Sequence, residues 1–226
     1  MLIFDLLAAG LCGCDQKLPS WTPFGTTEVN NHGIITPTER IRVFREQASQ
    51  APQIQDPARR EAICQDLVMQ LKNGGKGEPD SIIRGEILKT LAAYGGPTAD
   101  FVLRKAVQDP DSDVRVIVCT LWGKRSDADA ARVLEDVLAG DGDRDVRMAA
   151  ACGLGQAHDP TAVQALGAAL EDTDPAMRYC AMVALQESTG KDLGTDPTAV
   201  DRWRQYVKTG QEPPTSLAER VFPWLR

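Results

Sequence analysis

Carboxylates alternate along the chain at two places where they could bind a cation. The two triplets are Asp109/Asp111/Asp113 and Asp141/Asp143/Asp145. Their composition is similar to that of an EF-hand calcium loop, which also needs a Gly at its sixth position and a Glu at its twelfth. Counted from Asp141, these positions hold Val146 and Cys152. We therefore expect the carboxylates to cap helices, and we expect no metal and no cofactor.

Side chains for nucleophilic catalysis are few. The two histidines, His32 and His158, support no paired metal ligands and no Ser-His-Asp or Cys-His arrangement. Four cysteines fall in expected helices and form no Cys-x-x-Cys pair: Cys64, Cys119, Cys152 and Cys180. Packing in the core is the favoured interpretation, while one bridge between adjacent helical units is conceivable in an oxidising compartment. The sequence predicts no catalytic residue.

A further cysteine lies in a context that predicts a covalent modification. Residues 2–13 are mostly apolar, are too short for the ~20 residues of a bilayer span, and lead into Leu11-Cys12-Gly13-Cys14. This string resembles the bacterial lipobox. The resemblance implies that residues 1–13 are a signal segment, that Cys14 carries a lipid, and that the chain is anchored to a membrane of the cell envelope. The alternative is an ordinary apolar helix with two incidental thiols.

The charge balance of the chain argues against one class of partner, nucleic acid. The 226 residues carry 25 Lys and Arg against 32 Asp and Glu, which gives a net charge of −7. An acidic chain is poorly suited to neutralising phosphates, so we expect no nucleic-acid partner. The hydrophobic content of 42% is that of a globular protein, and with aromatics at 5% the core must be aliphatic.

An internal repeat organises most of the chain. Four arginines follow one another at spacings of 31, 32 and 31 residues, each with an aspartate four residues before it. The pairs are Asp80/Arg84, Asp111/Arg115, Asp143/Arg147 and Asp174/Arg178. An arginine one turn into a helix can bond the acidic N-terminus of its own repeat or the neighbouring repeat. We therefore interpret the columns as a structural ladder, with a ligand-binding row as the alternative.

Each repeat has the pattern of two antiparallel helices. The aspartate is an N-cap, and apolar residues one before, three after and seven after the arginine share one helix face. A second helix starts at a new cap such as Asp127. One such hairpin cannot bury both apolar faces, but stacked hairpins can. The predicted fold is all-α: a short right-handed α-solenoid of about five antiparallel helical hairpins.

The repeat also sets the expected organisation of the chain. A flexible tether spans residues 14–35, where proline and glycine interrupt any period. A degenerate hairpin follows over 36–79, then repeats over 80–110, 111–142, 143–173 and 174–210, the last lengthened by an insertion at 190–195. A tail with a short helix completes the chain over 211–226.

The strings Asp111-Ser112-Asp113-Val114-Arg115 and Asp143-Arg144-Asp145-Val146-Arg147 resemble HEAT repeats. An Ala-rich helix ending in Gly153-Leu154-Gly155 follows the second, and the unit is similar to the short subclass named after phycobilin lyases. The resemblance covers roughly residues 56–208 and implies the solenoid fold. One hydroxylase built from such repeats uses His-Glu motifs for iron, and neither histidine here precedes a Glu.

These observations favour a non-catalytic, membrane-anchored protein-interaction scaffold. Its partner would be another protein of unknown identity, and the chain would be monomeric without it. A small-ligand-binding or lyase-like accessory enzyme is the first alternative. A nucleic-acid-binding HEAT module is the second, and the net charge of −7 argues against it.

Overall fold

The computed structural model describes residues 36–125, 127–157 and 160–213, and regular structure in these ranges is entirely helical. The α-helices are α1 (Pro37–Gln50), α2 (Pro57–Lys72), α3 (Ser81–Tyr94), α4 (Pro97–Ala106), α5 (Ser112–Gly123), α6 (Ala128–Gly140), α7 (Arg144–Ala157), α8 (Pro160–Ala169), α9 (Pro175–Thr189) and α10 (Ala199–Thr209). Short 3₁₀ turns follow α1 and α2, at Ala51–Gln53 and Asn73–Gly75. The predicted signal segment, Cys14, the tether, both histidines and the predicted tail helix lie outside the described residues.

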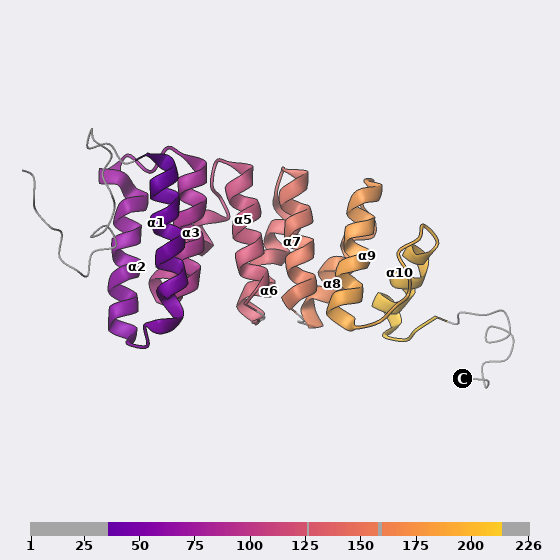
Figure 1. Cartoon of the computed structure of the whole chain (residues 1–226). Helices are drawn as coiled ribbons and strands as arrows, with labels where there is room; N and C mark the ends of the chain where they lie inside the picture. The colour runs from indigo at the N-terminus through magenta and orange to yellow at the C-terminus, as the bar shows by residue number, and fades with distance from the viewer. Residues whose placement is uncertain (1–35, 126, 158–159, 214–226) are drawn as a thin grey trace, which may run out of the picture.

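The helices stack in two layers along a single row, which Figure 1 shows from α1 to α10. The first helices of the hairpins pack in the order α1, α3, α5, α7 and α9. Among the second helices, α2 packs on α4, and α8 packs on both α6 and α10. Second helices also contact the next first helix, as α6 does α7 and α8 does α9. The prediction of an all-α solenoid is confirmed.

The helices begin where the sequence supplies side-chain caps. Asp80 accepts hydrogen bonds from the N–H groups of Ile82 and Ile83, and Asp111 accepts from those of Asp113 and Val114. The equivalent caps of α7 and α9 are Asp143 and Asp174. These carboxylates satisfy N–H groups that have no partner within the helix and oppose the positive end of its dipole. The aspartate column therefore fixes where α3, α5, α7 and α9 start.

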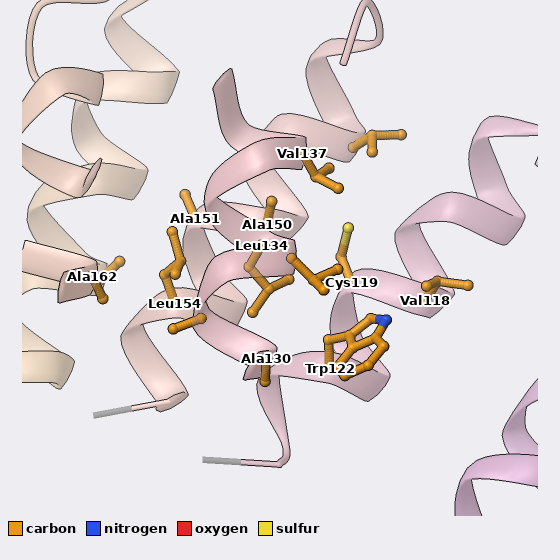
Figure 2. Packing of buried hydrophobic residues seen from close by; sticks show 14 of the residues in the cluster. Val118, Cys119, Trp122, Ala130, Leu134, Val137, Ala150, Ala151, Leu154 and Ala162 are labelled. Atoms are coloured by element: carbon orange, nitrogen blue, oxygen red, sulfur yellow. The ribbon is translucent and has the colours of Figure 1, made fainter. Parts of the chain in front are cut away.

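The apolar columns of the repeat form the core. The residues seven after each column arginine are fully buried: Leu91, Trp122, Leu154 and Leu185. The small residues that begin the second-helix column are buried as well: Ala99, Ala130, Ala162 and Ala199. Figure 2 shows Trp122, Leu134 and Leu154 packed between neighbouring helices. A continuous core, mostly aliphatic but with buried aromatic rings such as Trp122, thus runs through the stack, in which each hairpin covers the next.

Glycines let the first helices approach closely. A Cβ added at Gly123 on α5 would stand 2.6 Å from the Gly153 Cα on α7. On the other side of α7, a Cβ at Gly155 would stand 2.9 Å from the Ala184 Cα on α9. These distances are shorter than carbon atoms tolerate, so α7 can lie this close to both neighbours only because glycine has no side chain.

We predict that Gly123→Ala lowers the free energy of unfolding by about 1–3 kcal/mol, because the added methyl group pushes α5 away from α7. The matched control is Gly140→Ala at the end of α6, where a Cβ meets nothing within 4 Å. This control should leave stability within about 1 kcal/mol of the parent. Urea unfolding of the two variants measures the difference, and equal effects would contradict the close packing described here.

Candidate functional site

Two of the column arginines bond the loop that leads into the next repeat, not the aspartate four residues before them. Arg84 donates to Asp109 through Nε (2.9 Å) and Nη2 (2.7 Å). Arg115 donates to Asp141 in the same two-pronged way, at 2.8 and 3.0 Å. The four side chains are only 10–16% exposed. Each arginine therefore reaches a carboxylate that lies two residues before the cap of the next first helix.

The third nitrogen of each guanidinium also donates hydrogen bonds. Nη1 of Arg84 donates to the Glu78 and Pro79 carbonyls, and Nη1 of Arg115 donates to that of Asp109. The carboxylates in turn accept a backbone N–H two residues on, since Asp141 Oδ1 accepts from Asp143 at 2.8 Å. We name this arrangement the inter-repeat clamp. Its polar atoms bond one another, which makes it a poor place for a ligand.

The charges in the clamp stabilise each other. Burial alone would raise the pKa of Asp141, but the hydrogen bonds from Arg115 and from the Asp143 N–H hold that pKa below its ordinary value. The same bond to Asp141 raises the pKa of the Arg115 guanidinium. Both groups therefore keep their charges, and the pair is one of the partly buried, two-pronged ion pairs that contribute to stability.

The first hairpin contains a clamp that sequence analysis missed. Arg40 Nη2 donates to Glu78 Oε2 at 2.6 Å, and Glu78 Oε1 accepts from the Asp80 N–H. The signal was available, because Arg40 lies four residues after the Thr36 cap of α1, the spacing of the aspartate and arginine columns. The carboxylate column was missed as well; it comprises Glu78, Asp109, Asp141 and Asp172. The α1–α2 hairpin is therefore joined to α3 by a one-bond form of the contact that Arg84 and Arg115 make.

The last two column arginines have no such partner. Arg147 and Arg178 donate Nη1 to carbonyls of the loop before their own helix, at Asp141 and Asp172 respectively. Within the described residues, no carboxylate pairs with either guanidinium. Among the residues that the structure describes, Asp172 makes the local contact alone, in which its Oδ1 accepts from the Asp174 N–H at 2.7 Å. The inter-repeat clamp thus joins α1 to α3, α3 to α5 and α5 to α7, but not α7 to α9.

The aspartates of the two triplets have separate structural roles, and the third member of each, Asp113 or Asp145, is exposed in the first turn of α5 or α7. Asp109 and Asp141 belong to clamps, whereas Asp111 and Asp143 cap helices. In the part of the chain that the structure describes, no group of three or more His, Cys, Asp or Glu side chains is placed to hold a metal ion.

Hollows in the surface lie beside the second helices. One of about 500 Å³ separates α4 from α6 and is lined by Arg104 and Lys105 on one side and Val133, Asp136 and Val137 on the other. Another of about 330 Å³ lies between α6 and α8, where it extends to α7 and α9. Helix α6 therefore has a groove on each side, and these grooves are the candidate binding surface.

The sequence matches the family model of HEAT repeats over residues 65–154 and 134–220. The two matches together span more than half of the chain. The chain belongs to the HEAT-repeat family. A search of curated proteins finds no match.

HEAT repeats suggest a protein-interaction scaffold, and the contacts of this HEAT-repeat protein distinguish the parts that hold it together from those left for binding. The clamps and caps are used internally, whereas the grooves beside α6 are open to solvent. None of the described helices has the length and apolar character needed to cross a bilayer.

We predict that Asp141→Asn lowers the free energy of unfolding at pH 7 by about 1–3 kcal/mol, because it removes the negative partner of Arg115. Asp172→Asn is the matched control, since Asp172 makes the same local contact without a clamp. It should change stability by about 0.5 kcal/mol or less. Chemical unfolding of both variants provides the comparison.

The pH dependence follows from the lowered pKa of Asp141. A carboxylate whose pKa is lower in the folded state adds stability above its unfolded pKa of about 3.9, and that stability is lost as pH falls. The difference in the free energy of unfolding between the parent and Asp141→Asn should therefore be largest at pH 7 and should decrease toward pH 3. A difference in the free energy of unfolding that does not change with pH would show that the ion pair contributes nothing to stability.

Proposed function

We propose that this HEAT-repeat protein is a non-catalytic scaffold, anchored by a lipid to a membrane of the bacterial cell envelope, that binds a protein partner along α6. The observation that carries the proposal is the pair of grooves that flank this helix. Most charges of the repeated columns are used in clamps and caps, so recognition is left mainly to side chains outside these columns and to Arg147, which no clamp uses.

The groove between α4 and α6 has the chemistry of a peptide-binding surface. Val133 and Val137 provide an apolar floor, with Arg104 and Lys105 on one rim and Asp136 on the other. At the α4–α6 contact, Arg104 pairs with Asp129 and also lies 5.4 Å from the Trp122 ring centroid. An apolar segment with charges of both signs would complement this groove, as in recognition of helices and extended peptides.

The groove between α6 and α8 extends the same surface. Its lining includes Leu138 of α6 and Ala165, Ala168 and Ala169 of α8, which give it an apolar surface between charged residues. Arg147, which has no carboxylate partner in the described residues, and Glu171 supply charge there. A partner laid across α6 would contact both grooves, and this larger contact area favours a protein over a small ligand.

We predict that Asp136→Lys lowers recovery of the partner at least about tenfold, because it reverses one rim of the groove. The matched control is Asp113→Lys, an equal charge change on the exposed first turn of α5. Full-length tagged protein, crosslinked in native membranes and captured, gives the recovery by quantitative mass spectrometry. If Asp136→Lys and the control recover equal amounts of the partner, the partner does not bind in the groove between α4 and α6. Recovery of the scaffold alone, where known membrane complexes are captured, would count against the scaffold itself.

The membrane anchor rests on the resemblance of Leu11-Cys12-Gly13-Cys14 to the lipobox. We predict that Cys14→Ser, or treatment with globomycin, leaves an unprocessed precursor that no longer fractionates with membranes. Cys12→Ser is the matched control and should be processed normally. The measurements are membrane fractionation and the intact mass of the mature chain. Membrane association that survives both Cys14→Ser and globomycin would show that no lipid on Cys14 anchors the protein.

A further inference from the structure

Two cysteines face each other across the interface between α7 and α9. The Sγ atoms of Cys152 on α7 and Cys180 on α9 are 3.3 Å apart, within hydrogen-bonding distance for thiols. Cys180 Sγ also lies 3.5 Å from the Met148 carbonyl oxygen, to which it can donate. A disulfide requires a sulfur separation of about 2.05 Å. The remaining gap of about 1.3 Å is small enough for side-chain rotation and slight helix movement to close.

The helices on which these cysteines lie are held close together. A Cβ at Gly155 on α7 would stand 2.9 Å from the Ala184 Cα on α9, so the two backbones are nearly in contact near the thiols. Cys152 is exposed, whereas Cys180 is buried with 6% of its surface accessible. An oxidant can therefore reach Cys152 from solvent, and Cys180 lies behind it in position to react next.

The repeat pattern does not generate this pair. The positions equivalent to Cys152 and Cys180 are Thr120 and Ala149 at the α5–α7 interface. They are Lys89 and Ile117 at the α3–α5 interface. The thiol pair thus belongs to one interface, and this is the interface at which Arg147 lacks the carboxylate partner of the inter-repeat clamp. An ion pair between Arg144 and Asp174 does join α7 to the start of α9, but the Arg144 side chain is about half exposed to solvent.

The thiols differ in acidity. The hydrogen bond from Cys180 lowers the pKa of Cys152 to about 7, against the opposing effects of burial and of Glu187. The same contact, together with burial, raises the pKa of Cys180. Burial raises the pKa of Cys64 to about 11 and that of Cys119 to about 12. Among these four cysteines, Cys152 therefore has the largest fraction of thiolate near neutral pH, and thiolate is the form that reacts with disulfides.

We propose that Cys152 and Cys180 form a reversible disulfide that joins α7 to α9, introduced by exchange with a disulfide oxidant such as oxidised glutathione or a disulfide-bonded oxidoreductase. The Cys152 thiolate attacks one sulfur of the oxidant, whose S–S bond breaks and releases its other sulfur as a thiolate. Cys180 then gives up its proton and attacks Cys152 Sγ, which expels the second sulfur of the oxidant. Two protein thiols are oxidised to one disulfide, and the oxidant is reduced to two thiols.

This disulfide would replace the missing clamp with a covalent bond. It closes a loop between residues 28 apart and would hold the last repeats in a fixed orientation to α7. The groove between α6 and α8 borders these repeats. The redox state of the pair would therefore set the rigidity of one edge of the candidate binding surface.

Peptide mapping of the full-length protein tests the proposal. The chain is equilibrated with oxidised glutathione at pH 7, alkylated and digested with trypsin, which cleaves after Arg147, Arg178 and Lys191. Cys152 and Cys180 then lie in separate peptides, 148–178 and 179–191. We expect these peptides to be linked, with two hydrogen atoms fewer, and to separate on reduction. Free thiols in both peptides, or glutathione retained on Cys152, would overturn the proposal.

Single variants test the order of the steps. Cys180→Ser should accumulate glutathione on Cys152, because the second thiol is missing, while Cys152→Ser should leave Cys180 unmodified. Cys119→Ser is the control and should still form the linked peptides. Oxidation should raise the Tm of the parent by about 5–10 °C and should leave that of Cys152→Ser unchanged. An equal rise in Cys152→Ser would show that another site is responsible.

Discussion

This solenoid depends on one kind of contact. An arginine on a first helix bonds a carboxylate in the loop before the next first helix. It occurs between Arg40 and Glu78, Arg84 and Asp109, and Arg115 and Asp141. In each case the carboxylate also bonds the N–H of the helix cap two residues on, so one side chain fixes both the start of a helix and its distance from the previous repeat. Nearest-neighbour contacts of this kind determine the stability of repeat proteins.

The clamps divide the molecule by role. They occupy Arg84, Arg115 and their carboxylate partners, and glycines such as Gly123 and Gly155 let the first helices pack backbone to backbone. The surface that remains for recognition lies beside the second helices, where most of the lining side chains lie outside the arginine and aspartate columns. A rigid layer of first helices that presents variable side chains on the second layer is the arrangement expected of the proposed scaffold.

The sequence predicted what local chemistry determines. Aspartates at fixed spacing gave the helix caps, and residues such as Leu154 and Ala162 gave the core, because both depend on contacts along one helix or on its apolar face. The partner of Arg115 was not predicted, since Asp141 is 26 residues away and its position depends on how two repeats stack. The proximity of Cys152 and Cys180 was left open for the same reason, because it depends on how closely α7 and α9 approach. The grooves beside α6 result from packing between repeats and have no signature within one of them.

Hydrogen exchange of backbone amides in the full-length protein, under reducing conditions, tests the central claim most directly. The account predicts that α3, α5 and α7, which the clamps join, exchange as one cooperative unit with similar opening free energies. Helices α9 and α10, which lie beyond the last clamp, should open at lower free energy and exchange faster. Protection that is uniform from α3 to α10, or greatest in α9, would contradict the claim that the arginine–carboxylate contacts couple the repeats.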